Sequence, residues 1–254
     1  YDGYTGFWGD LARLSSRVSA SAPVAVVSSD TRIDVLFCCT TAWCRLVSLD
    51  QGLTWTQNVT LGSVFGGRNC TGNIGVGSSA PGSLDIAMRV GTSIVVRHLA
   101  ANGTATAWYS LTTTAGGSDP AVCSVSNASI MVAYTDTSGN ILNAKGYSTT
   151  WAAATTITGA TTTRPLSYAA RGLGLCDLVA SSPTGHFVMA FGQGTALSSS
   201  MLSIGYPMDG NLTVAAAMGV NVVQIYSTVR GVLQSVYGEA GGGAGEGLLG
   251  LATI

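Results

Sequence analysis

The feature that most constrains the fold of this 254-residue chain is a repeat of short apolar runs typical of β-strands. Four runs of five residues begin at Ile33, Leu84, Ile130 and Phe187, and a weaker fifth begins at Val232. Successive runs start 51, 46, 57 and 45 residues apart. This spacing is the length of one four-stranded blade of a β-propeller with loops of variable length. We therefore expect an all-β repeat protein. In each unit the apolar run is expected to be the second strand, preceded by an inner strand of small residues that suits a crowded centre and followed by a third strand.

A second series supports this interpretation, because tryptophans recur at a similar spacing. Trp55, Trp108 and Trp151 each follow a run of the first series, and the first two follow a turn containing glycine. Glycine supplies the left-handed backbone of a tight hairpin. We expect these tryptophans on the outer strand of successive blades.

The two ends of the chain are expected to complete one blade together. Trp8 lies 47 residues before Trp55 with no blade ahead of it, while residues 220–254 resemble a blade without its outer strand. Joining residues 4–14 to that blade would close the ring and remove exposed sheet edges. The sequence thus predicts a single domain over 1–254, a five-bladed β-propeller closed by pairing of its N- and C-terminal strands, with a Gly-rich loop at 237–247 in the last blade. The alternative is a β-sandwich or solenoid with the tryptophans spaced by chance.

One segment matches a named motif. Residues 48–55 fit the pattern S-x-D-x-G-x-T-W at Ser48, Asp50, Gly52, Thr54 and Trp55. The segment resembles the Asp-box of sialidase-like and related propellers. The resemblance implies a turn between the third and fourth strands of a blade, in which Asp50 caps backbone N–H groups and the indole packs beneath the hairpin. It implies a folding device and carries no catalytic residue.

The catalytic residues of sialidases are not recognisable in this sequence. The Arg-x-Pro element has no counterpart, since Arg164 is directly followed by Pro165. Glu239 and Glu246 are the only glutamates, and both lie in the Gly-rich stretch. A carboxylate pair for glycoside hydrolysis needs a rigid frame. We therefore expect no enzyme activity, no cofactor and no metal site.

Other polar residues remain weaker candidates. Asp34 and Asp85 hold equivalent places in two repeats, and Asp177 lies near a third, so a hydrolase site lined by aspartates is conceivable. The simpler expectation is that these aspartates cap turns or bond nearby N–H groups. His98 and His186 form no recognisable Ser-His-Asp arrangement and are expected to be ordinary surface or core histidines.

The composition indicates an extracellular glycoprotein. Only 9% of the residues are charged and the net charge is −1, so a nucleic-acid partner is not expected. Five N-x-Ser/Thr sequons are present, at Asn58, Asn69, Asn102, Asn127 and Asn211. The six cysteines suit an oxidising compartment and are Cys38, Cys39, Cys44, Cys70, Cys123 and Cys176. Cys39 and Cys44 could close a hairpin, and two of the last three could bridge adjacent blades.

Three functions follow from these observations. The favoured hypothesis is a structural or adhesive glycoprotein, secreted or at the cell surface, that associates with itself or with other extracellular proteins or glycans. It is favoured because loop residues do not repeat from blade to blade. The alternative is a lectin-like propeller that binds sugars through loop aromatics, and a sialidase-like hydrolase is the least supported. The aromatic candidates are Trp43, Tyr109, Tyr147 and Tyr206.

The apolar C-terminal run at 248–254 reads as a β-strand that must pair with another strand. It is expected to pair as the third strand of the closing blade, beside Trp8. Pairing with a neighbouring subunit is the alternative and would build a filament. No transmembrane segment is expected, because no apolar stretch is long enough.

Overall fold

A computed structural model of the chain shows β-strands joined by turns and contains no helix in the residues it describes. The described residues are 24–29, 31–39, 42–58, 61, 64–66, 74–126, 129–162, 166–171, 175–182, 185–191, 202–204, 213–216, 222–229, 232–239 and 248–253. These residues form five antiparallel sheets, which we number 1 to 5 along the chain.

Sheets 1 to 3 are formed by strands between residues 24 and 161. Sheet 1 consists of β1 (Val24–Ser29), β2 (Arg32–Cys39), β3 (Ala42–Ser48) and β4 (Thr56–Asn58). Sheet 2 consists of β5 (Ile74–Gly77), β6 (Leu84–Val90), β7 (Ser93–Leu99) and β8 (Tyr109–Thr112). Sheet 3 consists of β9 (Ala121–Ser126), β10 (Ser129–Thr135), β11 (Asn140–Tyr147) and β12 (Thr150–Trp151), with β13 (Thr155–Thr161) also paired to β11.

Sheets 4 and 5 repeat the same order of strands. Sheet 4 consists of β14 (Ser167–Arg171), β15 (Leu175–Ser182), β16 (Gly185–Phe191) and β17 (Leu202–Ile204). Sheet 5 consists of β18 (Thr213–Ala216), β19 (Val222–Val229), β20 (Val232–Glu239) and β21 (Leu248–Thr253). The first strands of the five sheets begin at 24, 74, 121, 167 and 213, so the repeat lengths are 50, 47, 46 and 46 residues.

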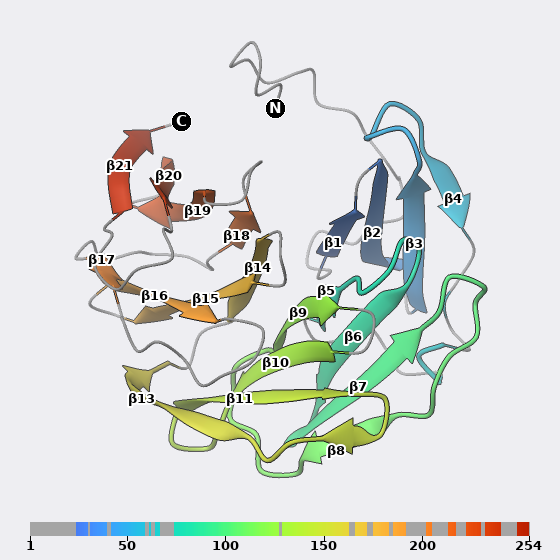
Figure 1. The fold of residues 1–254 in the computed structure, drawn as a ribbon, viewed down its shortest axis with the longest axis horizontal. Helices are drawn as coiled ribbons and strands as arrows, with labels where there is room; N and C mark the ends of the chain where they lie inside the picture. Colours follow the sequence, from blue (N-terminus) through green and yellow to red (C-terminus); the bar gives the residue numbers. More distant parts are fainter. Residues whose placement is uncertain are drawn as a thin grey trace.

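The five sheets are arranged around a common centre, with the first strand of each sheet innermost (Figure 1). The inner strands contact one another in sequence order, from β1 to β5, β9, β14 and β18. These contacts are close enough to require small residues. A Cβ atom on Gly75 of β5 would lie 2.6 Å from the carbonyl oxygen of Pro120, just ahead of β9. The expected crowding of the inner strands is therefore confirmed at this position.

Side chains alternate along the strands, so sheets 2 and 3 carry apolar residues on both faces. We call the interface between two consecutive sheets a seam. In the second seam, Ala87 and Val96 of sheet 2 pack with Ile130 and Val132 of sheet 3. The first and third seams are built in the same way, around Leu36 with Ile86 and around Ala133 with Leu178. The hydrophobic core is thus divided among the seams.

The apolar runs of the sequence do not all mark the same strand. In sheets 1 to 3 they lie on the second strand, but the runs at Phe187 and Val232 lie on the third strands β16 and β20. The prediction placed them on second strands and was wrong for sheets 4 and 5. Second and third strands are both central in a sheet and both carry apolar residues, so apolar character alone does not distinguish them.

The predicted closing blade also needs correction. Residues 248–253 pair with β20 of the same chain as the fourth strand of sheet 5, so this sheet is complete without residues 4–14. Trp8 lies outside the described residues, and no strand pairing among those described joins sheet 5 to sheet 1. Residues 237–239 of the expected loop at 237–247 belong to β20 instead, and residues 240–247 lie outside the described residues.

The segment that resembles an Asp-box forms the turn between β3 and β4. The amide and hydroxyl of Thr54 donate to the Asp50 carboxylate at 2.8 and 2.6 Å, and the Ser48 hydroxyl donates to it at 2.7 Å. These hydrogen bonds lower the pKa of Asp50 to about 2. Gly52 has the left-handed backbone that the turn requires, with φ of 94°. The indole of Trp55 donates to the carbonyl of Gly52 at 2.9 Å.

The expected placing of tryptophans on outer strands is confirmed for Trp151, and two further members lie one residue ahead of such a strand. Trp55 and Trp108 directly precede the outer strands β4 and β8, and Trp151 lies on the outer strand β12. Trp151 repeats the contact of Trp55, since its indole donates to the carbonyl three residues earlier, that of Ser148, at 3.0 Å.

Two disulfides agree with the possibilities drawn from the sequence. Cys39 and Cys44 close the hairpin between β2 and β3. Cys123 of β9 and Cys176 of β15 join sheets 3 and 4 with a Cα–Cα distance of 6.2 Å. Cys38 is also disulfide-bonded, and Cys70 lies outside the described residues.

The two disulfides should differ in their contribution to stability. Cys123 and Cys176 are 53 residues apart in sequence, whereas Cys39 and Cys44 are only 5 apart. Chain-entropy arguments assign about 2 kcal/mol more to the longer loop. We expect the variant C123A/C176A to lose about that much more unfolding free energy than C39A/C44A, as measured by denaturant titration. An equal or greater loss for C39A/C44A would contradict this expectation.

Candidate functional site

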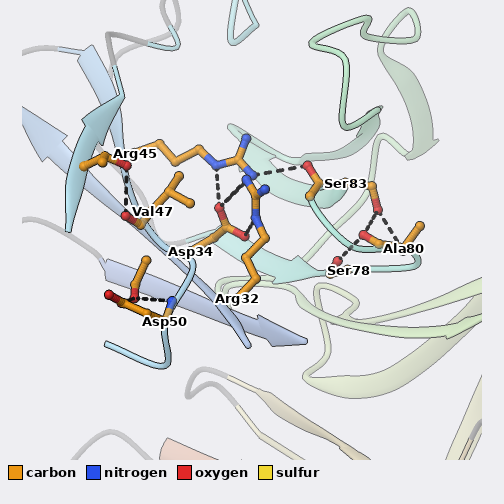
Figure 2. A network of polar contacts seen from close by, with 11 residues as sticks. Arg32, Asp34, Arg45, Val47, Asp50, Ser78, Ala80 and Ser83 are labelled. Atoms are coloured by element: carbon orange, nitrogen blue, oxygen red, sulfur yellow. Dashed lines mark hydrogen bonds and ion pairs between the residues drawn. The ribbon is translucent and has the colours of Figure 1, made fainter. Parts of the chain in front are cut away.

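The first seam contains a buried carboxylate held between two arginines (Figure 2). Asp34 lies on β2 on the same face as Leu36, which packs against sheet 2. Its carboxylate accepts hydrogen bonds from Arg32 at 2.8 and 3.1 Å, and from Nε of Arg45 at 2.7 Å. Arg45 on β3 also donates to the carbonyl of Gly82, which belongs to sheet 2, at 3.2 Å. We call Arg32, Asp34 and Arg45 the first-seam cluster.

The three charges of this cluster differ in exposure. The side chains of Asp34 and Arg45 are 3% and 7% exposed, whereas that of Arg32 is 24% exposed. Burial lowers the pKa of Arg45, and the charge of Asp34 opposes this shift. A buried ion pair costs desolvation that its attraction only partly offsets. The charge-assisted hydrogen bonds of Asp34 to both guanidinium groups reduce that cost.

The second seam contains a related group. Asp85 on β6 is fully buried and faces sheet 3 together with Ala87. One carboxylate oxygen lies 2.7 Å from Nδ1 of His98 on β7, and the other accepts a hydrogen bond of 2.8 Å from the Ser124 hydroxyl on β9. The ring of Tyr147, from sheet 3, lies 5.1 Å from that of His98. We call Asp85, His98 and Ser124 the second-seam cluster.

The two clusters share one design. In each, a carboxylate on the second strand faces the next sheet and is bound by a basic side chain on the third strand. A hydrogen bond also crosses the seam in each, from Arg45 to Gly82 in the loop between β5 and β6 in the first cluster, and from Ser124 to Asp85 in the second. The third seam departs from this pattern, because Met131 takes the corresponding place on β10. There the polar contact is a hydrogen bond of 3.0 Å from the Tyr168 hydroxyl to the Asn143 side chain.

The sequence placed Asp34 and Asp85 at equivalent positions but misjudged their contacts. They were expected to cap turns or to bond nearby backbone N–H groups. Their described hydrogen bonds go instead to side chains, because both aspartates face a neighbouring sheet. Three partners were missed, namely Arg32, Arg45 and Ser124. Strand alternation could have indicated Arg32, which lies two residues before Asp34 and so shares its face.

The aromatic candidates differ in accessibility. Trp43 is fully buried beside Phe65 in the first seam, so the idea that it stacks on a sugar is wrong. Tyr109 and Tyr147 are half-buried at the second seam, where Tyr109 stacks on Trp151. Tyr206 lies outside the described residues.

The remaining candidates give no further site in the described part of the chain. Asp177 and His186 lie on β15 and β16, but their side chains are outside what the structure describes. Arg164, Pro165 and Glu246 are likewise outside it, whereas Glu239 ends β20. No cluster of His, Cys, Asp or Glu suited to a metal ion occurs in the described ranges. These ranges also contain no helix long and apolar enough to cross a membrane.

Of the predicted glycosylation sites, two lie in the described residues. Asn58 is in the outer strand β4, and Asn102 is exposed in the turn between β7 and β8. Asn69, Asn127 and Asn211 lie outside the described residues.

Comparison with solved structures supports the fold. The chain is similar to the BP39L lectin from Burkholderia pseudomallei, with 13% identity, a TM-score of 0.68, and coverage of 97% of this chain and 74% of that one. A fungal lectin from Aleuria aurantia, described as a six-bladed β-propeller with a novel fucose recognition mode, gives 15% identity, a TM-score of 0.65, and coverage of 93% and 80%. The SapL1 lectin in complex with α-methyl fucoside gives 14% identity, a TM-score of 0.59, and coverage of 91% and 81%.

These similarities concern the fold. A β-propeller fold fits both the arrangement of the five sheets and the structural neighbours. No protein-family model matches the chain, and no curated protein matches it significantly.

Removing one hydroxyl should test the second-seam cluster. The substitution Ser124→Ala leaves one oxygen of the fully buried Asp85 without its described donor. We expect a loss of about 1–3 kcal/mol in unfolding free energy, the usual cost of an unsatisfied buried group. The matched control is Ser110→Ala, since Ser110 is exposed and bonds only locally to Thr112. Equal stability of the two variants in denaturant titration would show that the contact contributes nothing.

Proposed function

We propose that this chain is a carbohydrate-binding protein whose sugar sites lie where the first-seam and second-seam clusters reach the surface. The observation that carries the proposal is the repetition of a carboxylate and a basic side chain in two consecutive seams, while the third seam has Met131 in the corresponding place. Since one seam packs with an apolar residue there, packing alone does not demand the carboxylates. A binding role explains them better.

The exposed member of each cluster suits sugar hydroxyls. Arg32 has N–H donors and is partly exposed, with its Nη1 group outside the described contacts to Asp34. His98 is 14% exposed, and only its Nδ1 atom is engaged by Asp85. The half-buried ring of Tyr147 lies beside it. A few fixed polar groups beside aromatic surface are typical of small-ligand sites.

Two further observations support a lectin over the structural role that the sequence favoured. That role was preferred because binding residues did not repeat between blades, yet the seams do repeat a polar cluster. Two structural neighbours are also described by fucose recognition or by a complex with a fucoside. We transfer from them only the class of ligand.

We propose further that the protein is not an enzyme and acts outside the cell. The buried carboxylates of Asp34 and Asp85 lie in different seams, and each is bound by its own basic residue. Hydrolysis of a glycoside needs two carboxyl groups held about 5–10 Å apart on either side of one bond. The disulfides and the five sequons suit an oxidising, secretory environment.

A glycan array of the purified full chain tests the proposal. We expect the wild-type protein to bind at least one class of glycan and the variant R32Q/H98Q to bind it at least about tenfold more weakly, because each substitution removes one proposed ligand contact. The control is R89Q, since Arg89 is 34% exposed and pairs with Asp119 outside both clusters. Folded protein that binds no glycan, or a double variant that binds like R89Q, would refute the proposal.

Glycosylation provides a separate test of the compartment. Asn102 lies exposed in the turn between β7 and β8, and its side chain bonds only the amide of Thr104 in the same turn. We expect an N-glycan on Asn102 when the chain is made in a secretory pathway that glycosylates. Peptide mass spectrometry should detect it, and Asn102→Gln should remove that glycan alone. An unmodified Asn102 in such material would contradict the prediction.

A further inference from the structure

The first-seam cluster carries one more positive charge than negative charge. Two guanidinium groups share the single carboxylate of Asp34, so the cluster has a net charge of +1. The second-seam cluster has no such surplus, because Asp85 faces only one basic side chain, that of His98. The two seams therefore differ in charge although their design is shared.

The surplus charge lies at the surface end of the cluster. Arg45 is nearly buried and is engaged by both Asp34 and the carbonyl of Gly82. Arg32 is the exposed member, and its Nε and Nη2 atoms bind Asp34. Its Nη1 atom lies against the Gly82 loop, where a Cβ on Gly82 would be only 3.0 Å away. Arg32 is thus the member of the cluster that a ligand can reach.

The surroundings of Arg32 do not neutralise the charge. The loop of sheet 2 that borders the cluster carries neutral serines, and the hydroxyls of Ser78 and Ser83 both donate to the carbonyl of Ala80 (Figure 2). The turn between β3 and β4 holds Asp50, whose carboxylate is bound by Ser48 and Thr54, and no ion pair between Asp50 and Arg32 occurs among the described residues. Charge is scarce elsewhere too, since only 9% of the residues are charged.

We infer that the first seam selects a sugar that carries a carboxylate group, a step that rests on the proposed function. Arg32 and Arg45 both bind the carboxylate of Asp34, so the cluster already binds the chemical group that such a sugar would carry. A second carboxylate beside Arg32 would balance the remaining positive charge. Hydrogen bonds between guanidinium and carboxylate are about twice as strong as neutral ones, and their planar geometries match.

The test compares acidic glycans with their own reduced forms. Full-length protein is titrated calorimetrically with sialylated and uronate-containing oligosaccharides, and with the same oligosaccharides after reduction of each carboxyl to an alcohol. We expect the acidic form of at least one pair to bind about tenfold or more tightly, because a hydrogen bond to a charged group contributes more than one to a neutral group. Raising the salt concentration should narrow the difference.

Matched variants assign the preference to the cluster. R32Q should reduce the ratio of the affinities for the acidic and the carboxyl-reduced glycan toward one. R32K should give an intermediate ratio, and R89Q should leave the ratio unchanged. Thermal unfolding of each variant establishes that it is folded. A preference that survives in R32Q would overturn the inference, as would equal binding of sulfated glycans that lack a carboxylate. Binding of neutral sugars alone would refute this inference and leave the proposed function standing, whereas binding of no glycan at all would refute both.

Discussion

The structure depends on the packing of each sheet face against the next sheet. Period-two alternation gives the central strands two apolar faces, so a single sheet cannot hide its hydrophobic surface and must be covered on both sides. Seams such as those around Leu36 and Ala87 meet this requirement. The inner strands β5 and β9 can approach because glycine stands at a close contact between them, at Gly75. The arrangement of the sheets thus follows from sequence patterning and from one steric condition at the centre.

The buried carboxylates are exceptions to this apolar packing. Placing a charged group inside a seam costs desolvation free energy. Replacing a buried ion pair by apolar residues often leaves the stability of the fold unchanged or raises it. The third seam can be compared with the first two, because Met131 takes the place there that Asp34 and Asp85 take in the others. Asp34 and Asp85 are therefore not demanded by packing. Residues that depart from local packing rules without structural need are the usual signature of function.

Much of the fold could be predicted from the sequence, and the failures have physical causes. The repeat length, the tryptophan at the outer strand and the turn around Asp50 depend on local chemistry and spacing, which a sequence records directly. The runs at Phe187 and Val232 were placed one strand too early, since second and third strands are equally apolar. The last sheet was thought incomplete for the same reason, because shifting its strands by one left its outer position empty.

The candidate site was less accessible to prediction. The sequence showed that Asp34 and Asp85 are equivalent, yet all their partners except Arg32 come from other strands and, for Ser124, from another sheet. Which side chain of the next sheet meets a given carboxylate depends on how two sheets are rotated against each other. No local pattern encodes that rotation. The excess of positive charge in the first seam becomes visible only when Arg32, Asp34 and Arg45 are seen together.

The central claim is that sugars bind at the surface ends of the seam clusters. Its most direct test is a crystal structure of the full chain in complex with a glycan chosen by its affinity in solution. The account predicts a sugar ring in hydrogen-bond contact with Arg32 at the first seam or His98 at the second, beside Tyr147 in the latter case. A sugar bound elsewhere on the molecule, with both clusters unoccupied at saturating concentration, would contradict it.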